Sequence, residues 1–134
     1  MTELFLYTDG GSRNNPGPAA TGGVLKDSKG KIIEKFATFL GVATNNVAEY
    51  KALIEGLEIA LKHKPKKLTC YLDSQLVVEQ SLGHWKSKNA DLRPFVMQIQ
   101  KTLCEHPEIT LKHIPRAKNY EADQMVNREL DSQL

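Results

Sequence analysis

Alternating apolar and polar positions open the chain and predict a strand over residues 3–9. One face of this strand would carry Leu4, Leu6 and Thr8, and the other Phe5, Tyr7 and Asp9. The next segment, 9–20, reads DGGSRNNPGPAA, and its glycines, prolines and asparagines predict a loop. Two more strands are expected at 21–27 and 31–40, joined by a hairpin turn through 27–30. These three strands would form a meander.

From Asn46 onward the apolar positions change to a helical period, with Leu53, Leu57 and Leu61 on one face until Pro65 ends the run. The later elements predicted are a strand at 67–73, helices at about 75–82 and 90–104, a strand at 108–114 and a helix at 119–131. The resulting order is βββαβααβα. A meander followed by strand–helix–strand crossovers predicts an α/β fold, a mixed sheet with helices packed on its faces.

Composition and length predict a single domain over residues 1–134, with 40% hydrophobic and 25% charged residues and a net charge of +2. No apolar run approaches the roughly 18 residues that a membrane span needs, and the first residues do not resemble a secretory signal. We therefore expect a cytoplasmic protein without a membrane or protein partner, and a monomer. In that compartment Cys70 and Cys104, which lack metal-ligand spacing, would be free thiols.

Basic side chains gather in three short stretches of the sequence. These are Lys62, Lys64, Lys66 and Lys67; then Lys86, Lys88 and Arg93; then Lys112, Arg116 and Lys118. Such clusters either line a face that follows nucleic-acid phosphates or belong to solvated loops and helix ends. Charge alone leaves both interpretations open.

Four acidic residues occupy unusual positions: two are at the ends of predicted strands, and two are on the apolar faces of predicted helices. Asp9 and Asp73 end predicted strands, where ligands gather in α/β folds. Glu49 precedes Leu53 by four residues on the apolar stripe of its helix, and Asp123 leans toward the apolar face of the last helix. Together they predict a site for Mg²⁺ or Mn²⁺, because converging, partly buried carboxylates need compensating cations. No histidine and cysteine cluster suggests zinc.

Each acid also has a purely structural explanation. Asp9 could turn the chain, Asp73 could cap the following helix, and Asp123 could favour a helix amino terminus through the dipole. Glu49 could close a capping box with Asn46. Each explanation is sufficient for one acid taken singly, but together they do not explain why all four acids occupy such positions.

The sequence blocks around these acids resemble the four-part signature of the type 1 ribonuclease H family. The blocks are YTDGGSRNNPGPAATG, TNNVAEYKALIEGLEIAL, LDSQLVV and PRAKNYEADQMVNREL, and they span nearly the whole chain in the family's order and spacing. The resemblance implies a ribonuclease H-like fold with a five-stranded mixed sheet, the first three strands antiparallel, flanked by helices. It implies endonucleolytic hydrolysis of the RNA strand of RNA–DNA hybrids.

Carried over position by position, the family's catalytic, metal-holding acids fall on Asp9, Glu49, Asp73 and Asp123. The family's hybrid-contacting positions fall on Gly10, Ser12, Asn15, Asn45, Asn46 and Gln75. The implied chemistry uses two divalent cations, with Asp9 bridging both, and leaves 5′-phosphate and 3′-hydroxyl ends. Glu49, Asp73 and Asp123 would help hold the ion that activates water, while the second ion stabilises the leaving 3′-oxygen.

The RNA strand would be identified through its 2′-hydroxyl groups, which donate and accept hydrogen bonds in the shallow minor groove. Glu49, Gly10, Asn46 and Gln75 offer matching groups, while Asn15 and Asn45 would sense the DNA strand. Contacts to sugar and backbone imply little sequence specificity. Asn15 could alternatively serve only the Asn-Asn-Pro-Gly turn.

Two departures from the best-known bacterial members stand out. Their lysine-rich handle is replaced here by GHWKSKN, so Trp85, Lys86 and Lys88 are either a reduced hybrid-binding handle or a packed Trp beside exposed lysines. This stretch resembles a shorter-handled archaeal and bacterial branch. Arg116 stands where those members carry a loop histidine, and we expect it to steer phosphate by charge. His113, inside a strand, is interpreted as structural.

Two alternative functions remain open at this level. A binding module could hold nucleic acid without cutting it, but such descendants normally lose a metal carboxylate, and this chain keeps all four. Related folds also serve DNA nucleases and resolvases. The paired asparagines and the Asp-Ser-Gln block favour RNA–DNA hybrid as the substrate.

Overall fold

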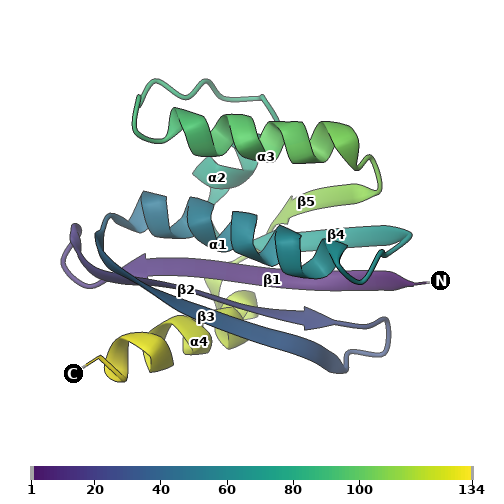
Figure 1. The fold of residues 1–134 in the computed structure, drawn as a ribbon, viewed down its shortest axis with the longest axis horizontal. Coiled ribbons are helices and arrows are strands. Elements are labelled where there is room, and N and C mark those ends of the chain that lie inside the picture. The colour runs from purple at the N-terminus through teal and green to yellow at the C-terminus, as the bar shows by residue number, and fades with distance from the viewer. Residues whose placement is uncertain (1, 134) are drawn as a thin grey trace.

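The computed structural model describes residues 2–133 and places them in one sheet with helices on both faces (Figure 1). The elements are β1 (Glu3–Ser12), β2 (Gly17–Lys26), β3 (Ile32–Ala43), α1 (Asn45–Leu61), β4 (Lys67–Leu72), α2 (Gln75–Ser81), α3 (Arg93–Glu105), β5 (Ile109–His113) and α4 (Tyr120–Asp131). A short 3₁₀ turn, Arg116–Asn119, precedes α4. The predicted order of strands and helices is confirmed.

The sheet has the strand order β3-β2-β1-β4-β5. β1 pairs antiparallel with β2, and β2 antiparallel with β3, whereas β4 lies parallel to both β1 and β5. This is the five-stranded mixed sheet that the sequence predicted. Helices α1, α2 and α3 cover one face of it, and α4 crosses the other face beneath β1, β2 and β3 (Figure 1).

The predicted loop over residues 9–20 is wrong. β1 continues through Ser12 and β2 begins at Gly17, so only four residues connect the two strands. The glycines in this stretch serve close packing more than turning. A Cβ on Gly10 would lie 2.2 Å from the backbone carbonyl carbon of Ala48 in α1. Just beyond the stretch, a Cβ on Gly22 in β2 would lie 2.7 Å from the carbonyl oxygen of Ala122 in α4. Glycine therefore lets two helices approach the central strands.

Two further boundaries differ from the sequence prediction. β3 continues to Ala43 because a bulge at Leu40, followed by Gly41 with a φ of +74°, lets the strand bend and keep its pairing with β2. α3 begins at Arg93 instead of residue 90, with proline at its first positions, where the missing N–H costs no helical hydrogen bond.

The main hydrophobic core lies between the sheet and α1, α2 and α3. It includes Leu4, Leu6, Tyr50, Leu53, Leu57, Leu68, Leu72, Val77 and Ile99. A smaller cluster of Ala20, Val126 and Leu130 lies under α4. Within residues 2–133, no helix is both long and apolar enough to cross a membrane. The core thus holds α1 and α4 against the central strands, which positions the polar groups described next.

Candidate active site

The carboxyl ends of β1 and β4 bring two of the predicted acids together. The two strands are parallel neighbours in register, with Leu6 opposite Cys70 and Tyr7 opposite Tyr71. Asp9 lies within β1, two residues beyond the last β1 residue that pairs with β4, and it therefore comes close to Asp73, which directly follows β4. Asp9 is only 7% exposed, so its charge lies largely out of water. Asp73 follows its strand as predicted. The prediction that Asp9 ends the first strand is wrong, because β1 stays paired with β2 as far as Ser12. The structure nevertheless brings the two acids together.

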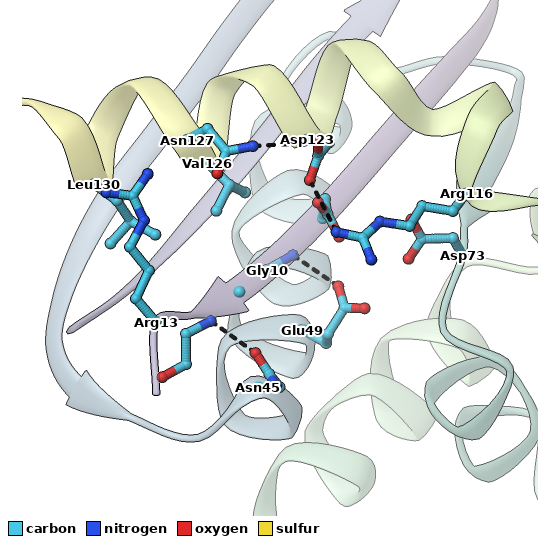
Figure 2. Close-up of a pocket in the computed structure, with 13 residues that line it drawn as sticks. Gly10, Arg13, Asn45, Glu49, Asp73, Arg116, Asp123, Val126, Asn127 and Leu130 are labelled. Carbon is cyan, nitrogen blue, oxygen red and sulfur yellow. Dashed lines mark hydrogen bonds and ion pairs between the residues drawn. The ribbon is translucent and has the colours of Figure 1, made fainter. Parts of the chain in front are cut away.

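Glu49 reaches the same place from the first turns of α1. The backbone N–H of Gly10 donates a hydrogen bond to Glu49 Oε1 at 2.7 Å, because the missing side chain of Gly10 lets the helix approach β1 so closely (Figure 2). The partly buried Glu49 is thereby held facing the strand end. Gly10 acts as both a spacer and a donor, which ties the helix to the site.

The structural explanations for Glu49 and Asp73 are not what the structure shows. Thr44, not a box between Asn46 and Glu49, caps α1, and its hydroxyl accepts from Val47 N at 3.2 Å. The hydroxyl of Ser74 caps α2 instead of Asp73. Threonine and serine are strong N-cap residues, so they satisfy the helix starts and leave both carboxylates free.

Asp9, Glu49 and Asp73 form a tight group in which one carboxylate oxygen from each lies within 4.8 Å of the others. Burial, together with the negative charge of Asp73, raises the pKa of Asp9 to about 8. Burial also raises the pKa of Glu49 well above its ordinary range, with Asp9 and Asp73 adding to the effect. The group is therefore short of positive charge, which is the condition that a bound cation relieves.

Asp123, in the first turn of α4, completes the set of four acids around the cavity. Its two carboxylate oxygens have different neighbours: Asn127 Nδ2 donates to Oδ2 at 3.2 Å, and Arg116 Nη2 lies 3.9 Å from Oδ1 (Figure 2). The buried Asn119 fixes the start of α4 over β1, since its Nδ2 donates to the Thr8 carbonyl at 2.8 Å. The helix thus presents Asp123 from the face opposite to Glu49.

These residues fit a divalent cation by the chemistry of their donors. Carboxylate oxygens are hard ligands that suit Mg²⁺ and Mn²⁺, and the group of three contributes oxygen only. Asp9 lies in its centre and shares electrostatic interactions with Glu49, Asp73 and Asp123. An arrangement with one central and several flanking carboxylates can hold more than one cation.

A cavity of about 360 Å³ surrounds the acids and contains several of the predicted positions. Its lining includes Asp9, Gly10, Ser12, Asn45, Glu49, Asp73, Arg116 and Asp123. It also includes Arg13 and Asn127, which the sequence reasoning missed. Asn127 follows Asp123 by one helical turn, a spacing that could have suggested the contact. Arg13 gave no signal, because it lies in the stretch that was predicted as a loop.

The remaining predicted positions lie outside this cavity. Asn15 and Asn46 line a separate hollow of about 240 Å³. Asn15 Oδ1 accepts from the backbone N–H of Asn45, whose own Oδ1 accepts from Ser12 N, so Asn15 ties the hairpin to α1 as well as serving the turn. Gln75 opens α2 directly after the Ser74 cap.

Trp85 and Lys86 line a third hollow, of about 350 Å³, between α2 and α3, and Lys88 follows in the same connection. Trp85 is 45% exposed, so nearly half of its surface faces solvent. His113 Nε2 lies 3.3 Å from the Asp73 carbonyl oxygen, which agrees with a structural role in holding the end of β4.

Comparison with known proteins gives a consistent family. A family model described as reverse transcriptase-like matches residues 7–129. Ribonuclease HI of Halobacterium salinarum is 42% identical over 128 residues, covering 96% of this chain and 64% of that protein. Ribonuclease H of Chromobacterium violaceum is 32% identical over 145 residues, covering 95% and 94%. Among mycobacterial relatives that are 39% identical, the chain spans 36% of their length.

Solved structures agree with the sequence relatives. LC11-RNase H1, isolated from compost by a metagenomic approach, superposes with a TM-score of 0.93 at 39% identity over 99% of both chains. The same protein in complex with an RNA/DNA hybrid gives a TM-score of 0.91 at 38% identity, over 97% of this chain and 98% of that one. From its sequence, sheet order and cluster of acids, this chain belongs to the type 1 ribonuclease H family.

Proposed function

We propose that this chain is an endonuclease that hydrolyses the RNA strand of RNA–DNA hybrids with little sequence specificity. The observation that carries the proposal is the convergence of Asp9, Glu49, Asp73 and Asp123 on one cavity at the carboxyl edge of the sheet. Four carboxylates with so little compensating charge destabilise a fold unless they serve a bound cation. The relative solved with an RNA/DNA hybrid supports the choice of substrate.

Two divalent cations, Mg²⁺ or Mn²⁺, when bound, would supply charge neutralisation and a lowered pKa for the attacking water. Asp9, which interacts with the other three acids, would contact both, and Glu49, Asp73 and Asp123, which come from different elements, would help to hold the ion that activates water. Gly10 keeps Glu49 oriented through its N–H, and Asn127 orients Asp123. Hydrolysis of this class leaves 5′-phosphate and 3′-hydroxyl ends on the RNA.

Recognition of the hybrid would use groups around the cavity that remain free to bond sugars. Ser12 and Asn45 line it directly, and the Nδ2 of Asn45 is available while its Oδ1 holds the Ser12 backbone. Gln75 at the start of α2 and Asn46 would meet the RNA strand, and Asn15, which lines the neighbouring hollow together with Asn46, would meet the DNA strand. Because these groups read sugar and backbone, base sequence should matter little.

Two basic regions would contribute positive charge. Arg116 lines the cavity beside Asp123, and its exposed guanidinium can steer phosphate, although it cannot carry protons at neutral pH. Trp85, with Lys86 and Lys88, would act as a reduced handle in which an aromatic ring and two cations contact the backbone of the hybrid. A short handle should make hybrid binding weaker and more sensitive to salt than in relatives that carry the full lysine-rich handle.

We further propose a single ribonuclease H domain over residues 1–134 that acts as a cytoplasmic monomer. Both cysteines are free thiols, Cys70 buried and Cys104 exposed, and this suits a reducing compartment.

The test is a cleavage assay with four labelled duplexes of the same sequence: RNA–DNA hybrid with either strand labelled, duplex DNA and duplex RNA. Each would be incubated in Mg²⁺, Mn²⁺ or EDTA, and the products compared with size markers that carry 3′-hydroxyl or 3′-phosphate ends. We expect cleavage of the RNA strand of the hybrid alone, dependent on the cation, with 3′-hydroxyl ends. Cutting of duplex DNA at a similar rate, or tight binding without cutting, would reject the proposal.

A further inference from the structure

One lining residue of the catalytic cavity has no role in the proposed reaction. Arg13 lies in the short connection between β1 and β2, and its side chain reaches along α4 toward Leu130. In Figure 2 it stands on one side of Gly10, while Asp73 and Arg116 stand on the other. Two guanidinium groups therefore flank the carboxylates from opposite sides of a single cavity.

The backbone that presents Arg13 is tightly fixed. Arg13 N donates to the Pro18 carbonyl at 2.8 Å, and the Ser12 hydroxyl donates to the Gly17 carbonyl at 3.2 Å. A Cβ on Gly17 would lie 1.8 Å from the Arg13 carbonyl oxygen, so only glycine allows this closure. A connection built in this way holds the base of the arginine at a defined place beside the cavity instead of leaving it on a mobile loop.

The side chain itself is anchored at one point and otherwise unused. Arg13 Nη2 lies 2.7 Å from Asp131 Oδ1 at the end of α4, and the two side chains are 41% and 64% exposed. An exposed pair of this kind contributes little to stability. Guanidinium carries five N–H donors, and within residues 2–133 the side chain of Arg13 hydrogen-bonds only to Asp131. Most of its donors are therefore available for a ligand in the cavity.

We infer that Arg13 binds a phosphate of the strand that is cut, next to the phosphate that reacts; this inference rests on the proposed function. The strand that passes over the carboxylates must also pass Arg13, because both line the same cavity. The cations that the carboxylates would hold act at the reacting phosphate, so a neighbouring phosphate of the strand needs positive charge of its own, which a guanidinium supplies. The planar fork of guanidinium suits phosphate, and the bond to Asp131 holds the Arg13 side chain at the end of α4, beside the cavity that Arg13 lines.

Such a contact has a recognisable signature. It is made to phosphate charge and not to the sugar, so it should support affinity and leave the preference for RNA over DNA unchanged. Because it neutralises one phosphate, it should also account for about one unit in the slope of log affinity against log salt concentration. A structural ion pair between the hairpin and α4 would produce neither effect.

The experiment compares Arg13→Ala with Arg128→Ala in the full chain. Arg128 is an exposed arginine of α4 that lies outside the cavity. Its replacement by alanine changes the net charge by the same amount as Arg13→Ala. We expect Arg13→Ala to raise the KM for hybrid roughly tenfold with little change in kcat, and Arg128→Ala to change neither. The salt slope of kcat/KM should fall by about one in Arg13→Ala alone, and the ratio of the affinity for hybrid to the affinity for duplex DNA should stay constant.

A second readout uses binding without cleavage, by fluorescence anisotropy of a labelled hybrid with Asp73→Asn as the parent. Arg13→Lys, which keeps the charge but not the fork, should retain the salt slope and lose only part of the affinity. This variant also carries the test if Arg13→Ala fails to fold, as judged by thermal unfolding. Equal KM values and salt slopes for Arg13→Ala and Arg128→Ala would overturn the inference. If the wild-type protein does not cut hybrid, the proposed function itself fails.

Discussion

Glu49 and Leu53 lie one helical turn apart on the same face of α1, yet their surroundings are opposite. Leu53 is fully buried in the core cluster that it shares with Leu6 of β1. Glu49 is directed at the same strand, where it accepts from Gly10 N and faces Asp9 and Asp73. One helix thus packs an apolar side chain against a strand and, a turn earlier, a carboxylate against other carboxylates.

The difference shows how the fold divides stability from chemistry. The later turns of α1 bury apolar surface and hold the helix on the sheet. The first turns use that attachment to bring Glu49 near other acids at an electrostatic cost, which is why the pKa of Glu49 is raised. Active sites commonly combine such locally unfavourable arrangements with a stable scaffold. Substitutions in the two regions should therefore have opposite effects.

The largest expected effect is on stability, from Leu53→Ala. Removing a fully buried leucine leaves a cavity and should lower the free energy of unfolding by about 2–5 kcal/mol. Urea denaturation followed by circular dichroism measures this. Activity per folded molecule should be nearly unchanged in mild conditions. A stability loss below that range would mean that the core around α1 is not what holds the helix to the sheet.

Glu49→Gln should lower activity and leave stability intact, the reverse of Leu53→Ala. The amide keeps the size of the side chain but loses the charge that would hold a cation, so kcat should fall at least about 100-fold. Unfolding stability in EDTA should stay equal or rise, because one of the mutually repelling carboxylates is gone. The control is Glu58→Gln, an exposed position on the same helix, which should leave both quantities unchanged. A destabilised Glu49→Gln variant with normal kcat would show that Glu49 serves the stability of the fold and not its chemistry.

The electrostatic repulsion within the acid cluster should also make the folding stability depend on pH when divalent cations are absent. The pKa of Asp9 is raised from 3.8 to about 8, so between those values the folded state holds a proton that the unfolded state releases. The stabilisation of the folded state by protonated Asp9 is therefore complete below about pH 4, declines as the pH rises, and is lost above about pH 8.

Asp9→Asn should remove that decline and stabilise the protein at pH 8.5 by about 1–2 kcal/mol in EDTA. Thermal unfolding across pH 4–9 would measure the difference, with Glu105→Gln, an exposed acid at the end of α3, as the matched control. A wild-type stability that rises over this range, with no gain in Asp9→Asn, would argue against a cluster short of positive charge.

The smallest effect is expected at the Trp85 region, far from both parts of α1. If Trp85 is part of a reduced handle, Trp85→Ala should weaken hybrid binding by about three- to tenfold, with unfolding temperature nearly unchanged. Anisotropy and thermal unfolding measured on the same variant separate the two interpretations. Loss of stability with normal binding would instead identify Trp85 as a packing residue.

Much of this organisation could be predicted from the sequence. Periodicity predicted the order of strands and helices, and the end of the fourth strand located Asp73, although Asp9 lies within β1 and not at its end. Helical spacing placed Glu49 on the face that packs against β1. These features depend on local patterns that the backbone geometry translates directly into position.

Other features could not be predicted, because they depend on which elements meet. Gly10 was part of the predicted loop, although its missing side chain permits close contact with α1, and Gly22 in the same way permits close contact with α4; a local pattern cannot express such contacts. The contact between Arg13 and Asp131 joins residues 118 positions apart. The caps at Thr44 and Ser74 were available in the sequence, but Asn46 and Asp73 competed for the same role.

The most direct test of the central claim compares wild-type protein with Asp73→Asn in single-turnover cleavage of an RNA–DNA hybrid in Mg²⁺. The substitution keeps the shape of the side chain and removes a charge from the acid cluster. We expect the wild type to cut the RNA strand and Asp73→Asn to lose at least about 100-fold in the cleavage rate, with folding and hybrid binding retained. Cleavage by Asp73→Asn at the wild-type rate would show that the acid cluster is not the catalytic centre.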